Sequence, residues 1–118
     1  MSELLLNEEG KTPNTFTQTP QNYPALEPLA IKKASLVFRA LNHALRQQMI
    51  KIIQQKDRVS VTEIFIEMRL EQSVASQHLA ILRRAGIVKP DRDGKFMYYR
   101  INSERLELIN KVIKELLG

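Results

Sequence analysis

The sequence contains no cysteine and only two histidines, His43 and His78. Without cysteine the chain cannot form disulfides, thiolate metal sites or thiol redox switches. Two histidines cannot build a multi-histidine metal site within one chain unless several carboxylates contribute ligands. We therefore expect no metal site, and no other bound cofactor is predicted.

Three further absences narrow the class of protein. No apolar run is long enough to span a membrane, and no charged segment leads into an apolar core as in a secretory signal. A cytoplasmic location without membrane contact is therefore expected. The chain also lacks a nucleophile–base pairing, a phosphate-cradling loop and a clustered pair of acids. These absences argue against an enzyme.

The formal charge of +5 is unevenly distributed along the 118 residues. Residues 1–28 contain four glutamates and one lysine, a charge of −3, which leaves +8 on the remainder. A basic globular part favours a polyanionic partner, most often nucleic acid. Charge alone is equally compatible with a generally basic, soluble surface.

Composition divides the chain into two regions. Residues 1–28 are rich in Asn, Thr, Gln and Pro and lack apolar periodicity, which predicts a flexible N-terminal arm. Residues 29–118 are predicted to form one domain, because apolar residues recur there at helical spacing. The spacing predicts helices over residues 29–41, 43–55, 60–68, 72–85 and 103–117.

Two of these helices begin with residues that are typical of helix caps. The run Ser60-Val61-Thr62-Glu63 fits a capping box, in which the hydroxyl and the carboxylate bond each other's main-chain amides. Ser103 is a plausible N-cap for the last helix.

A β-hairpin is predicted after Gly86. Residues 87–89 and 95–101 have strand character, and the turn-forming residues 91–94 lie between them. Alternation places Met97, Tyr99 and Ile101 on one face of the second strand and Phe96, Tyr98 and Arg100 on the other. The predicted fold class is mainly α (α+β): a winged helix-turn-helix of five helices with a two-stranded hairpin as the wing.

The helix over 72–85 is the candidate recognition helix. Ala75, Leu79 and Leu82 share one face, whereas Ser73, Gln77, Ala80 and Arg84 lie roughly opposite. The opposite face carries hydrogen-bonding and cationic groups without a carboxylate, and Gly86 follows as a candidate left-handed cap. By itself this segment could equally be an ordinary amphipathic surface helix.

Two motifs resemble the ArsR/SmtB family of bacterial repressors, and the resemblance covers roughly residues 36–118. The first is LEQSVASQHLAILRRAGIV at Leu70–Val88, and the second is Tyr98-Tyr99-Arg100-Ile101 in the wing. The resemblance implies a homodimeric repressor that binds double-stranded DNA at a roughly palindromic operator. A winged-helix module that binds proteins without specific DNA binding is the alternative.

The resemblance also implies which residues contact DNA: Gln72, Ser73, Ser76, Gln77 and His78. Among them Gln77 is the best candidate to read a base, because its amide can bond adenine with two hydrogen bonds. Ser73 could instead cap its helix, and His78 could be a packed histidine at the edge of the core. Candidates for contacts to the DNA backbone are Arg83, Arg84, Arg92, Lys95 and Arg100.

Arg46 matches an arginine of the family's second helix. It could touch phosphate or support the fold through a carboxylate, and the structural role is favoured.

A broad apolar stripe on the terminal helices predicts a dimer. The resemblance implies dimerisation through the first and last helices, and the candidate interface residues are Leu36, Leu106, Ile109, Val112, Ile113 and Leu116. The alternative is that the stripe closes the core of a single chain.

The chain departs from the family at its metal sites. Ser60 and Thr62 stand where the family's first metal-site motif has cysteines, and hydroxyls are poor ligands for soft metals. No histidine follows His78, so the family's second site also lacks a ligand. Metal sensing of the family's usual kinds is not expected, and a small-molecule or protein effector remains open.

Overall fold

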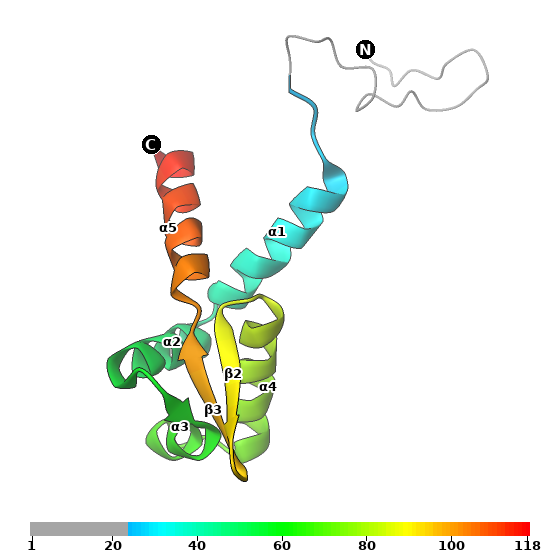
Figure 1. Cartoon of the computed structure of the whole chain (residues 1–118). Helices are drawn as coiled ribbons and strands as arrows, with labels where there is room; N and C mark the ends of the chain where they lie inside the picture. The colour runs from blue at the N-terminus through cyan, green and yellow to red at the C-terminus, as the bar shows by residue number, and fades with distance from the viewer. Residues whose placement is uncertain (1–23) are drawn as a thin grey trace, which may run out of the picture. The chain divides into compact units, whose positions relative to one another are not determined.

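The computed structural model describes residues 24–118 and places five helices and three strands in that part of the chain (Figure 1). The elements are α1 (Pro28–Leu41), α2 (Ala44–Lys56), β1 (Val59–Ser60), α3 (Val61–Glu67), α4 (Gln72–Arg84), β2 (Val88–Asp93), β3 (Phe96–Ile101) and α5 (Ser103–Leu117). The predicted fold class is confirmed. Most of the predicted arm, residues 1–23, lies outside the described residues.

The chain divides into two units between Lys33 and Ala34, inside α1. The winged domain occupies the second unit, Ala34–Gly118.

The sheet is antiparallel, with strand order β1-β3-β2. The expected hairpin is present, but β1 adds a third strand through two pairs, Val59 with Tyr99 and Ser60 with Tyr98. The predicted turn at 91–94 is wrong, because β2 continues to Asp93 and pairs there with Phe96. The actual turn is Gly94-Lys95, and Gly94 has the positive φ of 64° that favours glycine at this position of a tight hairpin.

The core lies where α2, α3 and α4 meet the inner side of the sheet. Ala75, Leu79 and Leu82 on the inner face of α4 are each 0% exposed, as their spacing predicts. Tyr99 is buried and Tyr98 is more exposed, so the predicted alternation along β3 is also confirmed. The largest fully buried side chains are Met49, Ile53, Val59, Ile64, Leu79, Leu82 and Ile87.

The helix ends show how local sequence positions α3 and α5. The capping box at the start of α3 is confirmed: the Glu63 amide donates to Ser60 Oγ at 3.1 Å, and the Ser60 amide donates to Glu63 Oε1 at 2.9 Å. The prediction of Ser103 as the cap of α5 is wrong by one residue. Asn102 caps this helix, because its Oδ1 accepts from the Arg105 amide while its Nδ2 donates to the Gly86 carbonyl.

Gly86 ends α4 with a φ of 78°, which confirms the predicted left-handed cap. A Cβ at this position would lie 3.1 Å from Arg105 Nε, so a close approach also favours glycine here.

Candidate nucleic-acid interface

The outer face of α4 presents a row of polar side chains to solvent. Gln72, Ser73, Ser76 and Gln77 are all exposed. Their direction follows from burial of the opposite face, since an amphipathic helix that packs its apolar stripe must turn its polar stripe outward. The structure therefore brings four of the five predicted α4 residues onto one accessible surface.

The start of α4 shows that Ser73 is not a cap. The N-cap is Glu71, whose side chain makes no capping hydrogen bond, and Ser73 lies within the first turn of the helix. Main-chain amides of an uncapped first turn lack partners within the helix and can donate to an external acceptor. The Ser73 hydroxyl and this helix start therefore both face solvent.

His78 is half-buried and lies at the side of α4 that meets α2. Its Nδ1 accepts a hydrogen bond from Arg46 Nη1 at 3.1 Å, because a guanidinium can only donate. Its ring also lies 4.8 Å from the ring of His43, centroid to centroid. The neutral His78 ring therefore carries its proton on Nε2, the one nitrogen left to donate to an outside group.

Burial is the main cause that lowers the pKa of His78 below its ordinary value of 6.5. The charges of His43 and Arg46 lower this pKa further. His78 is thus held in the neutral form at neutral pH. These contacts are those of a packed histidine at the edge of the core, which is the alternative that the sequence left open. Its Nε2 can still donate a hydrogen bond to an outside group.

Arg46 links His78 to the main chain of α1 through hydrogen bonds. Its side chain is buried, its Nε donates to the Ala40 carbonyl at 2.6 Å, and its Nη2 donates to the Arg39 carbonyl at 3.3 Å. The favoured structural role is therefore what the contacts show, although the partners are carbonyls and His78 rather than a carboxylate. Sequence spacing gave no signal for this contact, because Arg46 and His78 are 32 residues apart.

The basic candidates fall into two groups. Arg83 and Arg84 on α4 and Arg92 and Lys95 on the hairpin are exposed. Within residues 24–118, no carboxylate lies within ion-pair distance of these four side chains. Arg100 differs, because its Nη1 lies 3.2 Å from Asp57 Oδ2 and its Nε lies 3.9 Å from Asp91 Oδ2.

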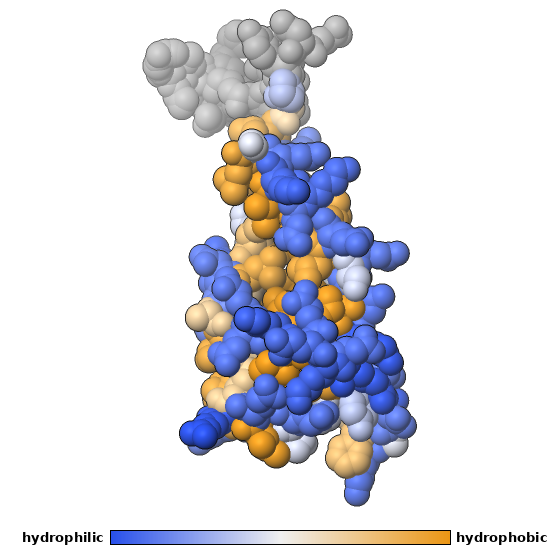
Figure 2. Space-filling view, turned by 90° about the vertical axis from the view of Figure 1, so that its left-hand side faces the viewer, coloured by the Kyte–Doolittle hydropathy of each residue, from blue (hydrophilic) through white to orange (hydrophobic). Residues whose placement is uncertain are grey.

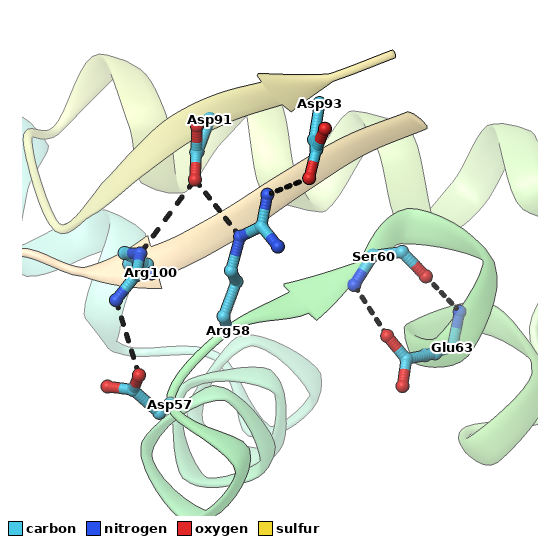
Figure 3. Close-up of polar contacts among 7 residues, drawn as sticks. All are labelled: Asp57, Arg58, Ser60, Glu63, Asp91, Asp93 and Arg100. Carbon is cyan, nitrogen blue, oxygen red and sulfur yellow. Dashed lines mark hydrogen bonds and ion pairs between the residues drawn. The ribbon is translucent and has the colours of Figure 1, made fainter. Parts of the chain in front are cut away.

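Arg100 belongs to a network of ion pairs on the outer face of the hairpin (Figure 3). Arg58, just before β1, donates from Nε to Asp91 at 3.0 Å and from Nη2 to Asp93 at 3.1 Å. Its guanidinium also lies 3.9 Å from the centre of the Tyr98 ring. The hydrogen bond to Asp93 is the main cause that raises the pKa of Arg58, and Asp91 raises it further.

The sequence does not predict this network, because its turn-forming composition places Asp91 and Asp93 in a turn and not in a strand. As strand residues two apart they share one face, and that spacing was the available signal.

The predicted interface residues of the terminal helices are exposed to different degrees. Leu36 is 54% exposed and Leu116 is 73% exposed, whereas Leu106, Val112 and Ile113 are half-buried. Ile109 is only 6% exposed and belongs to the core of the single chain. For Ile109 the structure supports the alternative, in which the stripe closes the monomer's own core. Figure 2 shows apolar side chains exposed among hydrophilic ones on the face that is at the left in Figure 1.

Ser60, at a position where the resemblance places a metal ligand, uses its hydroxyl in the capping box, and Thr62 is exposed. The residues from 24 to 118 include no group of three His, Asp or Glu side chains arranged to hold a metal ion. No helix in the same range is both long and apolar enough to cross a membrane.

Comparisons with known proteins agree with this architecture. The family model of bacterial regulatory proteins of the arsR family matches residues 44–89, which include α2, α3 and α4. An uncharacterized HTH-type transcriptional regulator of Methanocaldococcus jannaschii is 33% identical over 72% of this chain and 96% of its own length.

Two solved structures share the fold. The transcriptional repressor PagR of Bacillus anthracis superposes with a TM-score of 0.59 and 28% identity over 74% of this chain and 99% of that chain. A homodimeric winged helix-turn-helix DNA-binding domain of Mycobacterium bovis, described as a possible ArsR-family regulator, has a TM-score of 0.64 and 26% identity. That match covers 83% of this chain and 94% of that chain.

Proposed function

Because this chain belongs to the ArsR family of bacterial regulatory proteins, we propose that it acts as a homodimeric repressor that binds a roughly palindromic operator. The chain is a DNA-binding transcriptional regulator. What we propose beyond this is that it is a homodimer, that its operator is roughly palindromic and that it represses transcription. PagR, a similar protein, is a transcriptional repressor, which supports repression as the effect of this chain on transcription.

One observation carries the proposal. The polar outer face of α4 is accessible, and the exposed cations next to it form no ion pair with a carboxylate of residues 24–118. Exposed amides and hydroxyls can bond base edges in the major groove, which is wide enough to admit a helix. The exposed cations at the end of α4 and on the hairpin supply contacts to phosphate. A face of this chemistry suits DNA better than a protein surface.

Selection of bound sequences from random double-stranded DNA tests this function. We expect enrichment of a roughly two-fold symmetric site and retention of binding when divalent metals or a chelator are added. Recovery of no preferred sequence would contradict specific recognition. A requirement for metal, or release by metal, would contradict the proposal that metal sensing of the family's usual kinds is absent.

We expect Gln77 to read a base within that site. Gln77→Ala should weaken binding to the selected site by about 1–3 kcal/mol and leave binding to random DNA nearly unchanged. Gln48→Ala, which removes an exposed glutamine from α2 instead, is the matched control and should change neither affinity. Equal losses on selected and random DNA would exclude Gln77 as a base reader.

Exposed leucines on the terminal helices support the dimer. Leu36 on α1 and Leu108, Leu116 and Leu117 on α5 are each more than half exposed, at 54%, 53%, 73% and 84%. A two-fold dimer buries the same surface on both chains, and in helix-turn-helix dimers it places the recognition helices about 34 Å apart, one turn of DNA. The homodimeric domain from Mycobacterium bovis supports this assembly.

Leu116→Glu tests the dimer without disturbing the core. We expect the variant to sediment as a monomer, because a carboxylate in an apolar interface is strongly unfavourable. Ile66→Glu is the control, since Ile66 is a similarly exposed apolar residue, 64%, on α3. A Leu116→Glu variant that remains dimeric would exclude this part of α5 from the interface. Ile109 is unsuitable for this test, because its substitution would disrupt the core.

A further inference from the structure

Arg58 is placed to hold the outer half of the β2–β3 hairpin. It precedes β1, and its guanidinium reaches across to two carboxylates of β2, Asp91 at 3.0 Å and Asp93 at 3.1 Å. Figure 3 shows the guanidinium between these two carboxylates. Its carbon Cζ also lies 3.9 Å from the centre of the Tyr98 ring on β3. One side chain therefore contacts both strands of the hairpin.

The sheet itself supports this part of the hairpin weakly. β1 pairs with β3 over only two residues, opposite Tyr98 and Tyr99, and β2 is an edge strand. Beyond these pairs no further strand in the described part of the chain supports the hairpin's ladder, and the packing of its inner face on the core, through Met97, leaves its outer face uncovered. The two hydrogen bonds from Arg58 to Asp91 and Asp93 are an additional tie that holds β2. The ion pair of Arg100 with Asp57 supports the other end of the network.

The two cations proposed to contact DNA lie beside this tie. Arg92 is between Asp91 and Asp93 in sequence, so strand alternation turns it to the other face, and Lys95 lies in the adjacent turn. The orientation of the hairpin therefore determines where Arg92 and Lys95 can meet phosphate. Arg58 also offsets part of the negative charge of these two carboxylates, which would otherwise repel a polyanion.

We propose that Arg58 is a positioning residue for DNA binding, which holds the hairpin so that Arg92 and Lys95 contact the DNA backbone. The inference rests on the proposed DNA-binding function and concerns how the wing contributes to it. Arg58 acts through the hairpin and need not touch DNA.

The salt dependence of binding separates positioning from direct contact. Each phosphate contact contributes nearly one unit to the slope of log affinity against log salt. The double variant Arg92→Ala/Lys95→Ala should lower the slope on the selected site by about four, because the proposed dimer carries these two cations on each of its two chains. Arg58→Ala should lower it by a similar amount in the wild-type background and cause no further loss in the double variant. A further loss of about two units there, one for each chain of the dimer, would mean that Arg58 contacts phosphate itself, and it would overturn the proposal.

A second variant separates positioning from neutralisation. Asp91→Asn/Asp93→Asn added to Arg58→Ala removes the exposed carboxylates but does not restore the tie. If Arg58 positions the hairpin, this triple variant keeps the reduced slope of Arg58→Ala. Recovery of the wild-type slope would show that charge neutralisation is the whole effect, and it too would overturn the proposal.

Lys56→Ala is the matched control, because Lys56 is a nearby cation whose ion pair, 3.3 Å to Glu67, does not involve the hairpin. It should leave the slope close to that of the wild type.

Circular dichroism checks that each variant is folded. Arg58→Lys keeps the charge without the planar guanidinium, so its slope should resemble that of Arg58→Ala. Wild-type protein that binds no DNA would contradict the proposed function, whereas normal wild-type binding with an unchanged slope for Arg58→Ala would contradict this inference alone.

Discussion

α4 and the β2–β3 hairpin adjoin each other but are held in place by different forces. α4 packs Ala75, Leu79 and Leu82 into the core with no exposed surface. The hairpin buries its inner face too, through Val88 and Tyr99, but its outer face is held by ion pairs among exposed side chains. In these pairs the side chain of Arg58 is 29% exposed and that of Asp93 is 66% exposed.

The difference predicts how each element responds to its surroundings. Burial of apolar area depends little on salt or on the charge state of neighbours. Ion pairs at the surface contribute little net stability and are screened by salt. The position of α4 is therefore a property of the core, whereas the outer half of the hairpin can be adjusted by ionic conditions or by a bound polyanion.

The largest expected effect comes from the anchor of α4. Leu79→Ala should lower the free energy of unfolding by about 2–5 kcal/mol, because it removes buried methyl groups and leaves a cavity. Chemical denaturation measures this loss. Ser76→Ala, on the exposed face of the same helix, should change stability by less than about 0.5 kcal/mol. Similar losses for both variants would mean that α4 is not anchored through its inner face.

A smaller effect is expected on the hairpin. Asp93→Asn removes one of the two carboxylates that Arg58 binds and should shift the melting temperature by no more than a few degrees, since the pair is exposed. Thermal melts at low and high salt measure this shift. The shift should shrink as salt rises, because screening already weakens the pair in the wild type. A loss that persists unchanged in high salt would show that packing, not charge, holds the outer face.

The same contrast explains what the sequence predicts well. The inner and outer faces of α4 follow from helical spacing, because burial of an apolar stripe dictates the direction of every other side chain on the helix. The capping box follows from four consecutive residues for the same local reason.

The parts that could not be predicted depend on contacts between distant segments. β1 is only two residues long, too short to show a period. The residues 91–93 have turn-like composition, but pairing with β3 outweighs that local preference. The Arg58 network and the contact between Arg46 and His78 join residues more than thirty positions apart, at separations of 33, 35 and 32. The exposed polar face of α4 was predictable from the sequence, whereas these long-range contacts were not.

The smallest expected effect concerns a polar contact of α4, the hydrogen bond from Arg46 to His78. Burial, with the charges of His43 and Arg46, lowers the pKa of His78 in the folded chain below 6.5. Between the lowered value and the ordinary one the unfolded chain binds more protons than the folded chain, so acidification favours unfolding. The free energy of unfolding should therefore fall as the pH falls below about 6.5, until the folded chain is protonated as well.

His78→Gln isolates this contribution, because the amide oxygen can still accept from Arg46 but does not titrate. Denaturation curves between pH 7.5 and pH 5 should show a shallower loss of stability for the variant than for the wild type. Identical slopes would mean that His78 does not titrate differently in the folded and unfolded chains. A shallower slope would show that α4, although anchored by apolar burial, has one pH-sensitive edge where it meets α2, away from the salt-sensitive outer face of the hairpin.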